Sequence, residues 1–291
     1  MNKSFTLIEI LVVVVVIGVL SAFVLVGMNS ITDSANITKS KAFSDSLRNS
    51  LLNNIVSEWK LDGNANDSWG ANNGTVTGAT STDIDCANGS CYSFNGSDNY
   101  IDFGNPSNLN FGTNDFSFSF WIKSNGQGGL GTNGIIGKRI GTWSLTPPGV
   151  EVRAMTLNID VVMADGTTNL NGIGLMAAQR GKWKYIVYTF DRDEYLKGYL
   201  DGVYLVNSDI STINQSINNS YNFEIGRTQN NNGYCFLGYM DDVRIYSAVI
   251  ASSHIKQNYF IGLNNLYNQK SLIKEEYIQR IAELKNNISK N

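Results

Sequence analysis

The chain shows successive patterns of apolar and polar positions, and the first is an unbroken apolar segment. Residues 5–28 are apolar almost throughout, and Glu9 is the single ionisable residue among them. As an α-helix this segment would span roughly 36 Å, enough to cross the ~30 Å hydrocarbon core of a bilayer. Apolar residues then recur at about helical spacing from Ile31 to Ile55. We therefore expect a transmembrane helix over 5–28 that continues as an amphipathic helix over 29–57.

From about residue 58 the apolar period changes to two, which is typical of β-strands. The clearest example alternates Phe116, Phe118 and Phe120 with small or aromatic residues between them. Between 60 and 250 no stretch has a helical period. Dipeptides that favour tight turns separate the runs, namely Asp62-Gly63, Asn73-Gly74, Asn95-Gly96, Asp165-Gly166 and Asp201-Gly202. The pattern predicts an antiparallel β-sandwich or jelly roll over 58–262.

The last part of the chain returns to helical spacing. Its apolar stripe, with charged residues off the stripe, consists of Leu266, Ile273, Tyr277, Ile281, Leu284 and Ile288. We expect one short amphipathic helix over 263–291. It is too short for a long coiled coil, and it has three possible packing partners: the sandwich, the N-terminal helix or a neighbouring subunit. The fold class expected for the whole chain is α+β.

Composition narrows the classes of function. The 291 residues carry 22 Lys and Arg against 25 Asp and Glu, a net charge of −3. This balance argues against a basic nucleic-acid-binding domain, so we expect no nucleic-acid partner. His254 is the single histidine of the sequence, which argues against zinc sites built from several histidines. The aromatic content of 11% is too high for a disordered chain.

The N-terminus carries a recognisable motif. Ser4-Phe5-Thr6-Leu7-Ile8-Glu9 and the apolar run behind it resemble the N-terminal methylation motif of type IV prepilins and pseudopilins. The resemblance implies a leader peptide over 1–4, cleavage between Ser4 and Phe5 by a prepilin peptidase, and methylation of the new amine. It also implies that Glu9 faces the N-terminal amine of a neighbouring subunit during assembly. Two positions differ from the pattern, because Ser4 replaces the usual Gly and Val26 stands where many major pilins have Pro.

Two other interpretations of this segment stay open. A cleaved signal peptide would need an A-x-A-like site, which is absent. A plain signal anchor leaves Glu9 unexplained, since a carboxylate in the bilayer costs about 2.5–3.5 kcal/mol. The prepilin interpretation implies that the partners are other pilin-like subunits, the peptidase and the assembly machinery. It places the chain in the inner or cytoplasmic membrane as a single-pass protein, with the rest outside the cytoplasm, or in an extracellular filament.

Ordered blocks in the remainder resemble a second family. They are WKLDGNANDSWGANNGTVTGA (59–79), YSFNGSDNYIDFG (92–104), FSFSFWIKS (116–124), KWKYIVYTFD (182–191), YLDGVYL (199–205) and FEIG with GYMDDVRIYSAVI (223–250). Together they resemble the laminin G/concanavalin A-like jelly roll of bacterial surface and carbohydrate-active proteins. Members of that family bind glycans, bind proteins or act as structural accessories. We expect the sandwich core to contain Trp59, Phe94, Trp121, Trp183 and Tyr246.

We do not expect an enzyme. A retaining glycosidase needs two carboxyl groups ~5–5.5 Å apart. The closest group of acids is Asp191, Asp193 and Glu194 around Arg192, and its position at a strand end suits a solvated loop better.

Cys86 and Cys91 flank a flexible turn, so we expect a disulfide between them in an extracytoplasmic domain; two free loop thiols are the alternative. Cys235 is then left over, and we expect it to be a small buried apolar residue.

Some members of the jelly-roll family carry calcium, and the neighbouring first and last strands in that family would bring Asp62 or Asp67 near Asp241. We therefore consider a structural calcium held by these acids. The alternative is that they cap turns or pair with Arg244 and Lys60.

Ligand recognition is expected in loops at one edge of the sandwich. The candidates are the Gly-rich loop Asn125–Gly134 and the Asn-rich loop Thr228–Tyr234. Tyr234 offers a ring for stacking on a sugar, although both segments also suit ordinary hairpin loops. The sequence thus predicts a pilin-like or pseudopilin subunit that displays its jelly-roll domain for adhesion or for carbohydrate or protein recognition. The alternatives are a surface lectin that is anchored in the membrane without polymerising and, less well supported, an enzyme acting on polysaccharide.

Overall fold

The computed structural model of the chain describes residues 54–126, 133–140, 147–155, 158–175, 180–227 and 234–288. We call residues 54–288 the head. The chain divides into a unit Met1–Leu52 and a second unit Asn53–Asn291. The expected transmembrane helix, with Ser4, Phe5 and Glu9, therefore lies outside the described residues. Among the helices that the structure describes, none is long and apolar enough to span a membrane.

Two antiparallel sheets form the head, as the period-two pattern predicted. In the first, the described strands follow the order β13-β12-β11-β6-β15-β4-β3, and β1 also pairs with β15. The bounds of these strands are β1 Ile55–Trp59, β3 Thr80–Thr82, β4 Cys91–Asn95, β6 Phe116–Ser124, β11 Lys184–Phe190, β12 Tyr195–Leu200, β13 Val203–Asp209 and β15 Leu237–Tyr246. We call this the first sheet.

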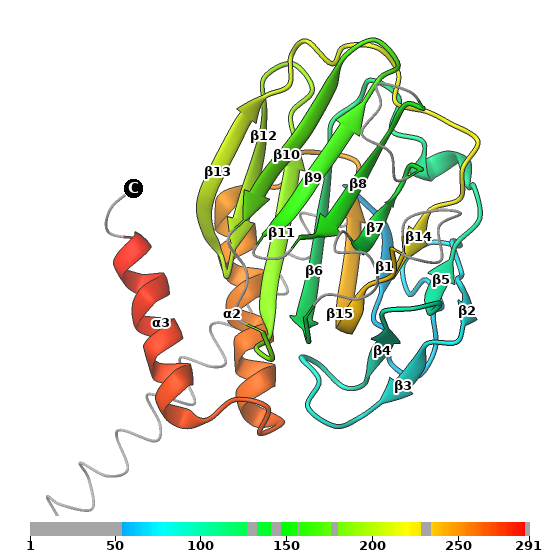
Figure 1. The fold of residues 1–291 in the computed structure, drawn as a ribbon. Helices are drawn as coiled ribbons and strands as arrows, with labels where there is room; N and C mark the ends of the chain where they lie inside the picture. Colours follow the sequence, from blue (N-terminus) through cyan, green and yellow to red (C-terminus); the bar gives the residue numbers. More distant parts are fainter. Residues whose placement is uncertain are drawn as a thin grey trace, which may run out of the picture. The chain divides into compact units, whose positions relative to one another are not determined.

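The second sheet lies against the first and completes a β-sandwich (Figure 1). Its described strands follow the order β10-β9-β8-β7-β14-β5-β2. Their bounds are β2 Thr75–Thr77, β5 Tyr100–Asp102, β7 Asn133–Lys138, β8 Gly149–Ala154, β9 Ile159–Ala164, β10 Asn169–Leu175 and β14 Glu224–Ile225. One short 3-10 helix, η2 (Ser107–Leu109), lies between β5 and β6.

The core between the sheets is made by alternate residues of each strand. From the first sheet, Phe116, Phe118 and Phe120 point inward and are fully buried. Val152 on β8 and Val161 on β9 face them from the second sheet. Fully burying one such side chain stabilises the fold by about 1.5–3 kcal/mol. Because residues two apart on a strand share a face, the period-two pattern at 116–120 places all three phenylalanines on the same side of β6.

The outer face of the first sheet is also buried, because a helix covers it. Helix α2 (Ser252–Asn268) stacks Tyr259 on Trp121, with 5.8 Å between ring centroids. Gly262 allows this close approach, since a Cβ there would lie 2.3 Å from the indole Cζ2 of Trp121. The expected aromatic core is therefore only partly right. Trp59 and Phe94 belong to the core between the sheets, whereas Trp121 packs under α2.

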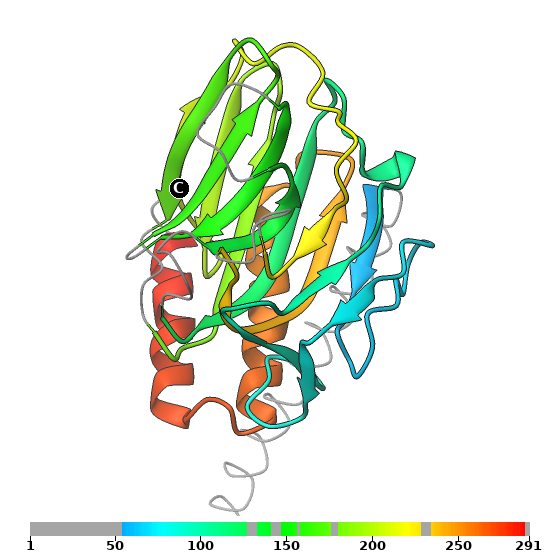
Figure 2. The ribbon, with the colours of Figure 1, turned by 45° about the vertical axis from the view of Figure 1, so that its right-hand side comes forward.

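The C-terminal part differs from the single helix expected over 263–291. It forms two helices, α2 and α3 (Lys274–Ile288), which lie side by side along one side of the sandwich (Figure 2). Lys270 has a positive φ of 62° between them, a left-handed conformation that ends a helix. The stripe is also only partly buried, because Leu266 and Leu284 are buried whereas Ile273 is 66% exposed.

Candidate functional site

The second sheet carries charged side chains on the face that points away from the core. Val150 and Val152 of β8 belong to the core, so Glu151 and Arg153 between and after them lie on the opposite face. Both are nevertheless only 2% exposed. Buried charged groups are costly unless they are paired, so their concentration on one sheet face marks a candidate site.

Arg153 lies opposite Asp160 of the neighbouring strand β9. The guanidinium Nη2 is 4.0 Å from the Asp160 carboxylate. Burial lowers the pKa of Arg153 and raises the pKa of Asp160, although the positive charge of Arg153 counteracts the rise in Asp160. Perturbed pKa values in one cluster are more frequent at functional sites than elsewhere.

Glu224 of β14 extends this cluster across the sheet. Glu224 is opposite Gly137 of β7, and Gly137 is opposite Glu151 of β8. The two glutamates therefore lie in one row across the sheet. Arg227 donates two hydrogen bonds to the Glu224 carboxylate, at 3.0 and 2.6 Å, and the guanidinium carbon lies 3.3 Å from the centroid of the Tyr100 ring. Burial alone would lower the pKa of Arg227, but the bonds with Glu224 raise it. We call this cluster the polar face; it comprises Tyr100, Glu151, Arg153, Asp160, Glu224 and Arg227.

Tyr234, the aromatic residue that sequence analysis selected for sugar stacking, lies beside the polar face. Its carbonyl accepts a hydrogen bond from the Gly134 amide at 3.0 Å, and Gly134 is opposite Arg153 in the sheet register. The next residue, Cys235, forms isolated bridges with Gly134 and Arg227. Tyr234 is half-buried. Residues 127–132 and 228–233 of the two candidate loops lie outside the described part of the chain.

Glu151, Arg153 and Glu224 are buried, whereas Tyr100, Asp160 and Arg227 are partly exposed. These three partly exposed side chains offer a hydroxyl, a carboxylate and a guanidinium, which suits a ligand rich in hydroxyl groups. The polar face does not have the two acids alternating along a strand that glycosidase chemistry uses, because Glu151 is followed two positions later by Arg153. Sequence analysis missed this face. Its signal was the segment Gly149–Ala154, in which valines alternate with charged residues, a pattern typical of a strand with one face in the core and one polar face.

The three acids considered for calcium fall into two places. Asp67 accepts hydrogen bonds from the backbone amides of Glu58, Trp69, Gly70 and Asn72, at 2.8–3.1 Å. This is the turn-capping alternative, so Asp67 does not fit a calcium site.

Asp62 and Asp241 instead meet the same loop. The Asp62 carboxylate accepts from the Ser90 amide, and the Asp241 Oδ2 from the Asn88 amide, each at 2.7 Å. The Oδ1 of Asp241 is buried without a hydrogen-bond partner among the described residues. Burial, followed by the charge of Asp242, raises the pKa of Asp241 well above its usual range. Among the described side chains, no group of three or more His, Cys, Asp and Glu is arranged to hold a metal ion.

The loop that meets these acids is closed by a disulfide. Cys86 and Cys91 are bonded, with 5.5 Å between their Cα atoms. The bond restrains Asn88 and Ser90, which donate to the two acids. Cys235 lies outside this disulfide and is fully buried, as the sequence analysis expected.

The acidic cluster at 191–194 is organised around its arginine. Arg192 is 3% exposed, and its guanidinium donates to the backbone carbonyls of Gly112, Ile213 and Gln215. This arginine joins loops at one end of the sandwich, so the cluster has a structural explanation.

Comparison with known proteins identifies the head and the N-terminus. Residues 95–256 match the model of the concanavalin A-like lectin/glucanases superfamily. Since the match covers more than half of the chain, the protein belongs to this superfamily. Residues 1–25 match the prokaryotic N-terminal methylation motif. Both resemblances inferred from the sequence are therefore confirmed.

Similar proteins include non-toxic nonhemagglutinin type A of Clostridium botulinum (strain Kyoto / Type A2), which is 29% identical over 195 residues, 66% of this chain and 16% of that protein. The binding domain of Paraclostridial Mosquitocidal Protein 1 superposes with a TM-score of 0.59 and 19% identity, over 74% of this chain and 53% of that domain. Domain 4 of AbnA, a GH43 extracellular arabinanase from Geobacillus stearothermophilus, was solved in complex with arabinotriose. It superposes with a TM-score of 0.52 and 17% identity, over 69% of this chain and 96% of that domain. These structural likenesses show a shared fold, and the chain spans only part of the first two proteins.

Proposed function

We propose that this protein is a pilin-like subunit whose N-terminal segment anchors it in the membrane and assembles it with like subunits, and whose head binds glycans. The observation that carries the proposal is the presence of a methylation motif at 1–25 and a lectin-like domain at 95–256 in one chain. The former is the processing signal of assembling subunits. The lectin-like domain belongs to a fold that many binding proteins share, so we assign ligand binding to the head and assembly to the N-terminal segment.

The glycan part of the proposal is supported by the polar face. The partly exposed Asp160 carboxylate and Arg227 guanidinium can hydrogen-bond neighbouring hydroxyls, and the half-buried Tyr234, whose backbone lies beside this face, carries an aromatic ring. Domain 4 of the arabinanase, which has the same fold, was solved with an arabinose oligosaccharide. Binding domains such as that of Paraclostridial Mosquitocidal Protein 1 share the fold, which supports binding over hydrolysis, so we propose a binding protein without catalytic activity.

Processing is tested by mass spectrometry of the protein expressed with its own prepilin peptidase. We expect the mature chain to begin at Phe5 with a methylated amine. A membrane-bound chain that retains Met1 in the presence of that peptidase would contradict the pilin-like assignment and favour a signal anchor.

Glycan binding is tested by probing a glycan array with the full-length protein in detergent. The matched variants are Arg227→Ala, which removes the guanidinium from the polar face, and Tyr234→Ala. We expect both to weaken binding by about tenfold. Binding that survives both variants would remove the polar face as the site, and no binding by the unaltered protein would leave a structural or protein-binding head.

A surface lectin that is anchored but does not polymerise is the second candidate. It shares every feature of the head, so only the N-terminal segment separates it from the first proposal. Glu9 favours assembly, because a plain anchor gains nothing from a carboxylate in the bilayer.

A further inference from the structure

The head has two distinct ends, and the chain enters at one of them. Ile55 at the start of β1 pairs with Tyr246 at the end of β15, and Tyr246 pairs with Ser117 at the start of β6. The opposite end of the sandwich is therefore where β6 finishes and β11 begins. Helix α2 starts after β15, extends along the sheet and reaches this far end, where α3 begins (Figure 1).

A cavity of about 110 Å³ lies at this far end, where the α2–α3 turn meets the residues before β11 and the segment between β3 and β4. Its polar lining comprises Asp85, Lys182, Ser271, Glu276 and Arg280, and Trp183 belongs to its wall. We call it the distal cavity. Its volume is less than the ~150 Å³ of an engineered cavity that holds benzene, so the distal cavity has room for one edge of a sugar ring whose remainder extends through the open side.

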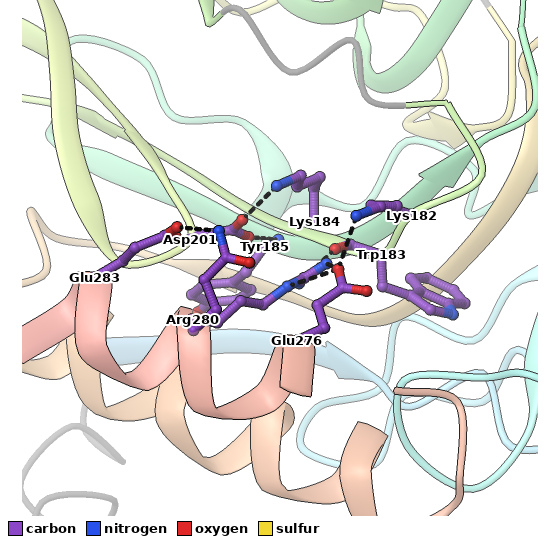
Figure 3. Close-up of polar contacts among 9 residues, drawn as sticks. Lys182, Trp183, Lys184, Tyr185, Asp201, Glu276, Arg280 and Glu283 are labelled. Carbon is purple, nitrogen blue, oxygen red and sulfur yellow. Dashed lines mark hydrogen bonds and ion pairs between the residues drawn. The ribbon is translucent and has the colours of Figure 1, made fainter. Parts of the chain in front are cut away.

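The polar groups of the distal cavity are held rigidly. Arg280 is 6% exposed; its Nη1 donates to the Trp183 carbonyl at 2.9 Å and its Nη2 to the Glu276 carboxylate at 2.8 Å. The same carboxylate oxygen lies 3.2 Å from Lys182 Nζ. Figure 3 shows Glu276 and Arg280 reaching from α3 to the strand residues. Burial alone would raise the pKa of Glu276, but these two cations lower it, so it is an ionised acceptor at neutral pH.

The charges in the distal cavity balance, which indicates the class of ligand. Within the lining, two cations, Lys182 and Arg280, face two carboxylates, Asp85 and Glu276. Asp85 is also ion-paired with Lys123, which lies outside the lining. An anionic ligand would meet repulsion from the carboxylates, and a cationic one from Lys182 and Arg280. A hydroxyl both donates and accepts, so adjacent hydroxyls match this lining. The Lys182 side chain is 48% exposed, which leaves its ammonium accessible from solvent.

The family match covers only part of the distal cavity. It extends from residue 95 to residue 256, so Lys182 and Trp183 lie inside it, whereas Asp85, Ser271, Glu276 and Arg280 lie outside.

We propose that the distal cavity binds the uncharged terminal sugar of a glycan, at the end of the head opposite to where the chain enters it. The inference rests on the proposed glycan-binding function and adds a site that is separate from the polar face. Lys182 and Ser271 donate to sugar hydroxyls, and Glu276 and Asp85 accept from them.

The test uses the full-length protein in detergent on a glycan array, followed by affinity measurements on the glycan it retains. Lys182→Met removes the accessible donor, and Ser271→Tyr fills the cavity with a ring. The matched control is Lys285→Met, which removes an exposed lysine from the last turn of α3. Affinities are measured in the Arg227→Ala background, so that binding at the polar face does not mask the distal cavity. In that background we expect the first two variants to lose about tenfold or more in affinity and the control to lose nothing. The free monosaccharide that ends the retained glycan is expected to compete.

The outcomes separate the two proposals. If the unaltered protein binds a glycan, and Lys182→Met and Ser271→Tyr bind it equally well, the distal cavity is not the site and the glycan-binding function stands. If only glycans with an acidic terminal sugar bind, the proposed ligand class is wrong. If no glycan binds, both proposals fall. Melting temperatures of all variants identify a loss that comes from unfolding; should Ser271→Tyr unfold, Lys182→Met decides.

Discussion

The carboxylates of the head differ in how many hydrogen bonds they accept, and this separates structural acids from candidates for function. Asp67 accepts four backbone amides, which leaves little capacity for a ligand. Asp165 is similar: its carboxylate accepts from the amides of Thr167, Thr168 and Gln215. Asp241 keeps a buried oxygen without such a partner. The sequence shows all of these as aspartates near turns, so it did not distinguish them.

Asp165 is expected to stabilise the head in a pH-dependent way. Burial alone would raise its pKa, but the hydrogen bonds of the turn lower it from 3.8 to about 2. A folded-state pKa below the unfolded one stabilises the fold above the unfolded value, and this contribution is lost as the pH falls from about 4 towards 2. Asp165→Ala should cost about 2 kcal/mol at neutral pH, and much less at pH 2. Asp165→Asn, which keeps one acceptor oxygen, should cost less. The measurement is a series of thermal melts between pH 2 and neutral pH. If Asp165→Ala were destabilised equally at pH 2 and at neutral pH, the ionised carboxylate would not be the source of the stability.

We propose that calcium binds at Asp62 and Asp241, with Asp67 excluded because its carboxylate caps a turn. A variant of Asp241 tests this proposal. A bound ion would supply positive charge beside a buried carboxylate whose pKa is raised. Calcium added to chelator-treated protein should raise the melting temperature of the unaltered chain, because a ligand at a hundred times its dissociation constant adds about 2.7 kcal/mol to the free energy of unfolding. Asp241→Asn should not respond, whereas the exposed control Asp209→Asn should. Identical melting with and without calcium would favour capping and ion pairing alone.

At the scale of elements, Gly262 tests how α2 is docked on the first sheet. An alanine in place of glycine inside a helix normally stabilises it by about 1 kcal/mol. Here the added Cβ would lie 2.3 Å from the rigid indole of Trp121, and overpacking of this kind costs about 1–3 kcal/mol. Gly262→Ala should therefore destabilise the head, as measured by chemical unfolding. Partial recovery in a Gly262→Ala/Trp121→Phe double variant would attribute the cost to this contact, and a stabilised single variant would contradict the packing.

The strands were predictable from sequence because period-two patterns and turn dipeptides are local. Asp201-Gly202, for example, forms the turn between β12 and β13, with both residues at positive φ. Helix α2 was not predicted, although Ile255, Tyr259 and Leu263 recur at a spacing of four and are buried. The reason is that the second face of β6 carries the small residues Ser117 and Ser119 beside Trp121, and nothing in the sequence says whether a helix or solvent covers that face.

At the scale of the whole molecule, the sequence identified the two families but not the sites. Motifs such as Ser4–Glu9 are contiguous, so one segment is enough to recognise them. The polar face joins β5, β8, β9 and β14, and the distal cavity joins residue 85 to the C-terminal helix. Such sites depend on contacts between distant segments, which only the fold brings together. Tyr234 was selected from its loop, and its neighbours Arg153 and Arg227 became visible only through strand register.

Assembly is the remaining property of the whole molecule, and Glu9 tests it. Glu9→Ala removes a carboxylate whose insertion costs about 2.5–3.5 kcal/mol, so membrane insertion should be unchanged or improved. The same change removes the proposed partner of a neighbour's methylated amine, so filament yield should fall strongly. Mass spectrometry should show that the variant is still cut before Phe5, and glycan binding by its head should be unaltered. Ser4→Gly, which restores the usual residue before the cut, is the matched control and should be processed at least as fast as the natural chain. Normal filaments from Glu9→Ala would contradict the assembly role of this residue and favour an anchored lectin that does not polymerise.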